Sequence, residues 1–173
     1  MSACCDKEKA PSARDCAEAA DTGGSAERAI ALFEQGCNCA QAVLAVFAHL
    51  AGMSESAALR LSSSFGGGLG RQREVCGAVS GMCMAAGLLY GYDDVSDPAL
   101  KAEHYARIQE LCAAFRSLYG SIICRELLGA KRADDSPNPT PRDAEFYRTR
   151  PCARFVGACA ELLENYIGAH PLA

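Results

Sequence analysis

The stretch FGGGLGRQREVCGAVSG, residues 65–81, decides how this chain folds. Its glycines suggest a phosphate-binding loop, but a dinucleotide fingerprint would need a third glycine where Arg71 stands, and a P-loop would need Gly-Lys-Ser/Thr. We therefore expect the glycines to form a tight turn between two helices and to bring the backbone close to whatever Cys76 holds. Arg71 and Arg73, beside a helix start, leave the binding of an anion as the alternative.

Signals for helix starts and ends recur on both sides of this stretch. The expected starts are Asn38, Ser54, Asp97, Ser121 and Pro151, and the expected ends are Gly36, Gly52, Gly120, Gly129 and Gly168. No alternating strand pattern and no internal repeat is seen. The sequence therefore predicts an all-α fold, a single-domain bundle of about six to seven helices over residues 25–170. Residues 1–24 lack a sustained apolar period, which predicts a disordered or mobile tail.

Eleven cysteines are the outlying feature of this 173-residue chain. Half of the residues are hydrophobic, so the core needs no disulfides, and the N-terminus lacks the apolar segment of an export signal. We therefore expect a cytoplasmic protein, in which thiols stay reduced and clustered cysteines bind metal or do redox work. The net charge of -4 does not favour nucleic-acid binding. Two uncharged runs, residues 36–53 and 75–91, contain polar residues and are expected to be buried helices and not membrane spans.

Three further features bear on packing. Gly77 and Gly81 are spaced as GxxxG, which lets a second helix approach closely, either within the chain or across a homodimer. Between Leu100 and Leu118, apolar residues repeat with a helical period, which predicts one buried face. The polar, proline-rich residues 131–150 are too long for a routine connection, so we expect either a disordered loop or a lid over the site.

Four cysteines occupy expected first turns of helices: Cys39, Cys76, Cys124 and Cys152. Unpaired amide N–H groups and the positive end of the helix dipole favour the thiolate there, and the thiolate is both a nucleophile and a metal ligand. Four such helix ends converging would stabilise a negatively charged, thiolate-bound cluster. Cys83, Cys112 and Cys159 fall in the middle of expected helices and are predicted to be core residues.

Four segments carry a more specific pattern: FEQGCNCAQAV, FGGGLGRQREVCGAVSGMCMAAGLLYG, FRSLYGSIICRELLG and CARFVGACAELL. Together, over about residues 28–167, they resemble the redox-active family named for its own cysteine pattern, C-GCAxxG-C-C. The resemblance implies iron–sulfur and electron-transfer chemistry in anaerobic bacteria, since relatives of this domain occur in split-Soret cytochromes. By matching motif, the family's cysteines fall on the same four positions. The chain has no CxxCH motif, so covalent haem is not expected.

Several other residues are secondary candidates. Cys37 and Cys83 depart from the family pattern, so they are extra thiols that could shift the ligand set, and Cys37 with Cys39 could form a redox dithiol. Four charged residues flank the expected ligands and could tune the charge of a cluster: Arg71, Arg73, Glu74 and Arg125. The alternative for Glu74 and Arg125 is a structural ion pair. No role is assigned to the tail residues Cys4, Cys5 and Cys16.

Three functions fit these patterns. The first is an electron-transfer protein in which the four cysteines bind a [2Fe–2S] or [4Fe–4S] cluster, working with a redox partner protein. The second is a thiol–disulfide or soft-metal-handling protein that uses the same cysteines, and the third is a structural zinc module. No Ser/His/Asp set or carboxylate pair stands out, which favours electron transfer over substrate turnover and leaves an oxidoreductase activity open.

Overall fold

The chain folds into a bundle of α-helices in a computed structural model that describes residues 23–129 and 136–172. The helices are α2 (Ser25–Glu34), α3 (Cys39–Ala48), α4 (Glu55–Ser62), α5 (Gly77–Tyr90), α6 (Pro98–Tyr119), α7 (Cys124–Leu128), α8 (Ala144–Thr149) and α9 (Cys152–Ala169), with 3₁₀ turns η1 (His49–Ala51) and η2 (Ser63–Phe65). Since no strand occurs within those residues, the all-α prediction is confirmed. The predicted tail, apart from its last two residues, and the three cysteines in it lie outside the described residues.

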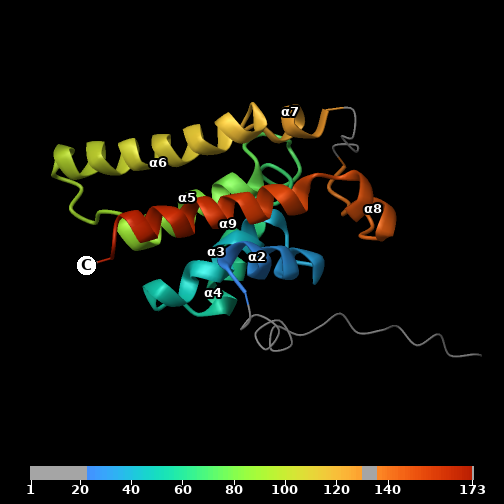
Figure 1. Cartoon of the computed structure of the whole chain (residues 1–173), viewed down its shortest axis with the longest axis horizontal. Helices are drawn as coiled ribbons and strands as arrows, with labels where there is room; N and C mark the ends of the chain where they lie inside the picture. Colours follow the sequence, from blue (N-terminus) through green and yellow to red (C-terminus); the bar gives the residue numbers. More distant parts are fainter. Residues whose placement is uncertain (1–22, 130–135, 173) are drawn as a thin grey trace, which may run out of the picture.

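The helices form layers around α3 and α5 (Figure 1). In Figure 1, α6 runs along one side, α5 and α9 occupy the middle, and α2, α3 and α4 lie on the other side. The most extensive contacts join α3 to α5 and α2 to α9. Val43, Leu44 and Phe47 of α3 are buried in the centre, where removing their apolar surface from water stabilises the fold. No helix in the described part of the chain is long and apolar enough to cross a membrane.

Asn38 fixes where α3 begins. Its side-chain oxygen accepts hydrogen bonds from the amides of Ala40 and Gln41, both at 3.0 Å. The Gln41 side chain in turn accepts a 2.9 Å bond from the Asn38 amide, which completes a capping box. The predicted cap is therefore confirmed, and it makes Cys39 the first residue of the helix.

The GxxxG glycines of α5 are buried against α3. A Cβ atom at Gly81 would lie 2.6 Å from the Ala40 carbonyl oxygen, and one at Gly77 would lie 2.6 Å from the Cys39 sulfur. Only glycine permits this approach of the two backbones. The surface considered for a homodimer is thus covered within the chain, and the oligomeric state stays a prediction.

The later helices differ from the prediction in two details. Leu100 and Leu118 are 39% and 60% exposed; the buried residues of α6 are Leu111 and Phe115, and Tyr119 in its last turn also packs against the core. The proline-rich segment contains α8, whose N-cap Asp143 accepts a hydrogen bond from an amide of the first turn. With this short helix the described residues contain eight helices, close to the predicted six to seven, and the prediction of a helical bundle is confirmed.

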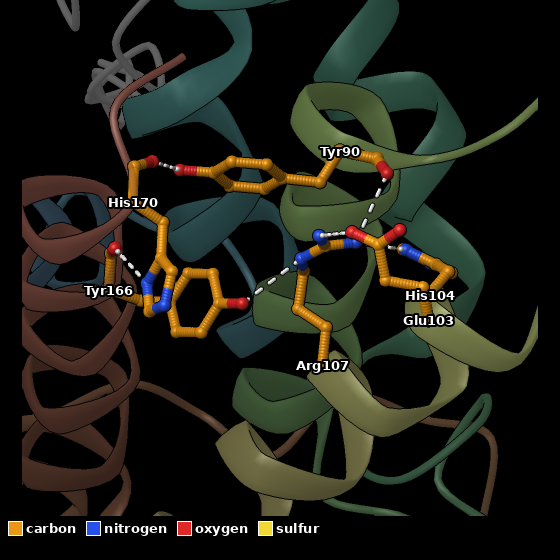
Figure 2. A network of polar contacts seen from close by, with 6 residues as sticks. All are labelled: Tyr90, Glu103, His104, Arg107, Tyr166 and His170. Atoms are coloured by element: carbon orange, nitrogen blue, oxygen red, sulfur yellow. Dashed lines mark hydrogen bonds and ion pairs between the residues drawn. The ribbon is translucent and has the colours of Figure 1, made fainter. Parts of the chain in front are cut away.

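A polar network joins α5, α6 and α9 at the ends of α5 and α9 (Figure 2). Arg107 of α6 donates to the Tyr166 hydroxyl at 3.1 Å and to the Tyr90 carbonyl at 3.3 Å, and it pairs with Glu103 at 2.9 Å. The Tyr90 hydroxyl donates to the His170 carbonyl at 2.7 Å. The C-terminal ends of α5 and α9 are therefore held together by this network. Cys76 and Cys152 lie at the opposite, N-terminal ends of the same two helices.

The substitution Gly81→Ala tests the close packing of α3 and α5. The new methyl group would meet the Ala40 carbonyl oxygen, a backbone atom that cannot rotate away. We expect a loss of about 1–3 kcal/mol in the free energy of unfolding, measured by urea denaturation followed by circular dichroism. Gly87→Ala, in the same helix with nothing within 4 Å of the added atom, is the matched control and should stabilise by up to about 1 kcal/mol. Equal effects of the two changes would contradict this packing.

Candidate functional site

The four first-turn cysteines line one cavity of about 340 Å³. Each comes from the beginning of a different helix: Cys39 starts α3, Cys76 occupies the N-cap position of α5, Cys124 starts α7 and Cys152 starts α9. Residues far apart in the sequence thus meet at one place, as four converging helix starts would require. Whether these thiols bind a metal stays a prediction.

Backbone pairing sets the positions of Cys76 and Cys124. The Cys76 amide donates to the Ile122 carbonyl at 2.8 Å, and the Cys124 amide donates to the Glu74 carbonyl at 2.6 Å. An antiparallel bridge between Val75 and Ile123 lies in the middle of this pairing. The two cysteines are therefore held by main-chain hydrogen bonds and do not depend on side-chain packing alone.

This pairing also corrects the predicted start of α7. Ser121 is not the N-cap, because Ile123 is drawn into the bridge and occupies the N-cap position in an extended conformation. The Ser121 hydroxyl accepts from the Ile123 amide at 2.9 Å and contacts Glu126, so it supports the turn from two residues upstream.

The glycine loop packs directly on the cysteines. A Cβ atom at Gly68 would lie 2.8 Å from the Cys124 Cβ atom and 2.8 Å from the Glu74 amide nitrogen. Gly67, Gly68 and Gly70 have positive φ angles, and so do Arg71 (69°) and Arg73 (64°). Left-handed non-glycine residues are strained and cluster at functional sites. The expectation of a tight turn is therefore confirmed, and the turn packs on Cys124, whereas a group held by Cys76 stays a prediction.

Four arginines line the same cavity, and no Asp or Glu of the described residues does. They are Arg71, Arg73, Arg142 and Arg150. Arg73 is only 2% exposed, and its guanidinium lowers the pKa of the Cys124 thiol by direct contact and by charge. Burial lowers the pKa of Arg150, and the positive charges of Arg73 and Arg71 lower it further. The cavity therefore concentrates positive charge beside the thiols.

The proline-rich segment supplies two of these arginines and covers part of the cavity. Arg142 donates to the Phe33 carbonyl at 2.6 Å and lies over the Phe33 ring, 4.5 Å from its centroid. Arg71 donates from Nε to the Ser136 carbonyl at 2.5 Å and to the Thr140 hydroxyl at 3.1 Å, which fastens the segment to the glycine loop. Residues between 136 and 150 thus line the cavity, as a lid would, and their role as a lid over a functional site stays a prediction; residues 130–135 lie outside the described part.

The sequence-predicted residues divide into two groups. Arg71 and Arg73 line the cavity as expected, whereas Glu74 and Arg125 form an ion pair at 2.6 Å outside it, as the structural alternative proposed. Cys37 and Cys83 do not line the cavity. Arg142 and Arg150 were not identified as cavity residues from the sequence. Their position shortly before Cys152, in the segment expected to form a lid, could have indicated it.

Burial dominates the acidity of the cavity thiols. It raises the pKa of Cys124, and it raises the pKa of Cys152 to about 12, with added repulsion from Cys39 in both cases. It also raises the pKa of Cys76 well above its usual range, and Cys39 adds to the effect. The amides of Ala78 and Val79, in the first turn of α5, act in the opposite direction and lower the pKa of Cys76. The Cys76 side chain nevertheless makes no capping hydrogen bond to the helix. The thiols would therefore lose their protons together only if a positive group joined them.

The donor set of the cavity consists of four thiols, with backbone amides and arginines beside them. Among the residues described, no three His, Cys, Asp or Glu side chains are arranged around one ion. A tetrahedral zinc site needs all four sulfurs at about 2.3 Å from the metal. In a [4Fe–4S] cluster each cysteine binds a different iron, so the sulfurs stand farther apart around a wider cavity. Four thiols, adjacent amides and arginines are groups that would fit such a cluster.

Comparison with known proteins agrees with this site. No curated protein and no solved structure matches the chain. A family model described as "Putative redox-active protein (C_GCAxxG_C_C)" matches residues 37–166, which contain all four cavity cysteines, the glycine loop and α5. This match spans most of the 173 residues, and the resemblance seen in the sequence is confirmed. The chain belongs to the C_GCAxxG_C_C family of redox-active proteins.

Proposed function

We propose that this protein transfers electrons through an iron–sulfur cluster held by four cysteines: Cys39, Cys76, Cys124 and Cys152. The observation that carries the proposal is the meeting of four thiols from four helix starts in one cavity that four arginines line. A disulfide would need only two of these thiols. The family's redox character supports the same class of function.

Charge favours a thiolate-bound cluster in this cavity. Four thiolates outweigh the positive charge of the iron–sulfur core, so the assembled group is negative and is stabilised by nearby cations and amide dipoles. Arg73 and Arg150 both lower the pKa of Cys124, and Arg150 and Arg142 lower that of Cys152. These arginines would favour the more negative, reduced state.

The apolar part of the lining would control access of water. Phe33, Phe146 and Phe155 border the cavity, and Arg142 lies over the rings of the first two. A drier site strengthens the interaction between each arginine and the thiolates. We expect the same side chains to shield a cluster from solvent and thereby to set its potential. The chemistry suits a reducing cytoplasm and needs a redox partner protein to supply or accept electrons.

The pair Cys39→Ser and Cys37→Ser tests which thiols are ligands. Cys39 lines the cavity, whereas Cys37, two residues earlier, does not. We expect iron and acid-labile sulfide in protein purified without oxygen to fall to near zero in the first variant and to stay at the wild-type level in the second. Iron and sulfide are measured by chemical analysis, with circular dichroism to show that both variants fold.

Other outcomes would favour the alternative functions. Stoichiometric zinc without sulfide would point to a structural zinc module. Colourless, metal-free protein with a two-electron titration of the cavity thiols would point to thiol–disulfide exchange at this site. Equal loss of iron in both serine variants would contradict the assignment of Cys39 over Cys37.

Arg150→Gln tests the electrostatic role of the cavity arginines. Removing a cation beside Cys152 and Cys124 should make reduction harder by about 1 kcal/mol, a shift of roughly 40 mV to more negative potential for a one-electron couple. Arg125→Gln is the control, because that arginine follows Cys124 but pairs with Glu74 at the surface. Potentials are read from a spectroscopic redox titration. A shift of similar size in both variants would contradict a specific role for Arg150.

A further inference from the structure

We propose that Cys83 and Cys112 form a reversible disulfide between α5 and α6, a second redox site separate from the four-cysteine cavity. Their sulfur atoms lie 3.9 Å apart, and both thiols are free. Neither residue lines the cavity, and neither is among the cysteines that the family resemblance assigns to a cluster. The two residues were expected to be core cysteines, yet both side chains are only partly buried.

The geometry leaves a short step to the bond. A disulfide has a sulfur–sulfur distance of about 2.05 Å, so the two atoms must approach by roughly 2 Å. Both residues sit within helices that already pack together, Cys83 on α5 and Cys112 on α6. Rotation about the two Cα–Cβ bonds moves the sulfur atoms without unwinding either helix.

The two thiols differ in acidity, as the partners of an exchange reaction should. The hydrogen bond with Cys83 lowers the pKa of Cys112 to about 7, and the positive charge of Arg116, one turn further along α6, acts in the same direction. The same hydrogen bond raises the pKa of Cys83, and burial raises it further. Cys112 is therefore the thiol that attacks, and Cys83 is the thiol that resolves.

The oxidant in this reaction is a disulfide of a small molecule or of another protein. The Cys112 thiolate attacks one sulfur of that disulfide, forms a mixed disulfide and releases the other sulfur as a thiolate. Cys83 then gives its proton to the released thiolate and attacks the Cys112 sulfur. This displaces the second external sulfur as a thiolate, which takes up from solvent the proton that Cys112 had lost. In sum, two protein thiols are oxidised to one disulfide, and one external disulfide is reduced to two thiols.

Cys159 connects this pair electrostatically with the cavity. It is fully buried in α9, and its pKa is raised by burial and then by Cys76, Cys39 and Cys112. The charge of Cys159 also raises the pKa of Cys83. This third thiol is the nearest competitor for the bond, so the test must separate it from Cys83.

The test uses the full chain purified without oxygen, reduced, and equilibrated with glutathione and glutathione disulfide at several ratios. After alkylation of free thiols and digestion with trypsin, Cys83 lies in the peptide of residues 74–101 and Cys112 in that of residues 108–116. We expect a cross-link between these peptides, with fragment ions placing it at Cys83 and not at Cys76. Its amount should follow a two-electron titration and vanish on reduction with dithiothreitol. In the reduced protein at pH 7, Cys112 should be alkylated about tenfold faster than Cys83.

Matched variants complete the experiment. Cys83→Ser and Cys112→Ser should each abolish the cross-link and leave the iron content unchanged, while Cys37→Ser should leave both unchanged. The proposal is overturned if both thiols stay free at every ratio, if Cys112 pairs with Cys159, or if it stops at a mixed disulfide with glutathione. Iron and sulfide in the same samples report on the cavity, so failure of the dithiol and failure of the cluster are separate results.

Discussion

Three backbone hydrogen bonds join the end of the glycine loop to the start of α7, and the arrangement of the cavity depends on them. The amides of Cys76, Cys124 and Arg125 donate to the carbonyls of Ile122, Glu74 and Arg73 at 2.8, 2.6 and 3.0 Å. The glycines matter because they let the loop turn back tightly enough to present these groups. At Gly68 a side chain would collide with Cys124, and at Gly77 it would collide with Cys39. One short stretch therefore brings three of the four cavity cysteines together.

This arrangement places arginines beside buried thiols, and the two would compensate each other once the thiols lose their protons. Burial alone would keep the cavity thiols protonated and would disfavour the positive charge of Arg150. Arginine and thiolate each offset the cost of burying the other, as paired buried charges do elsewhere. The strained positive φ angles at Arg71 and Arg73 fit this account, because the chain adopts them while placing both guanidinium groups on the cavity.

The sequence predicted the features that local chemistry controls. The cap at Asn38, the Asp97–Pro98 helix start and the left-handed glycine at Gly120 depend on neighbouring residues only, and each lies where it was expected. Cys39 and Cys152, each directly after such a signal, follow in the same way. Ser121 failed as a cap because Ile123 pairs with Val75, a residue far away in sequence, and no local pattern reveals such a bridge.

Features that depend on how the helices pack could not be predicted from the sequence. The exposure of Leu100 and Leu118 depends on which residues of α6 meet the neighbouring helices, and helical periodicity does not encode this. Arg142 and Arg150 reach the cavity through the fold of a proline-rich segment that carries no regular pattern. The proximity of Cys83 and Cys112 depends on the rotation of α5 against α6 about their axes. A sequence indicates that each lies within a helix but not that they face each other.

The two sulfur groups share α5 and lie at different points along it. Cys76 and Cys83 are seven residues apart, so the rigid helix keeps them about 10 Å apart along its axis. No residue of α6 lines the cavity, but Phe115 and Tyr119 of α6 contact the ring of Phe155, which does line it. The chain leaves α6 through Gly120 in a left-handed conformation, and the bridge at Ile123 then fixes the backbone before Cys124. The bridge thus holds the backbone next to Cys124, and α6 is connected to the cavity through the ring of Phe155.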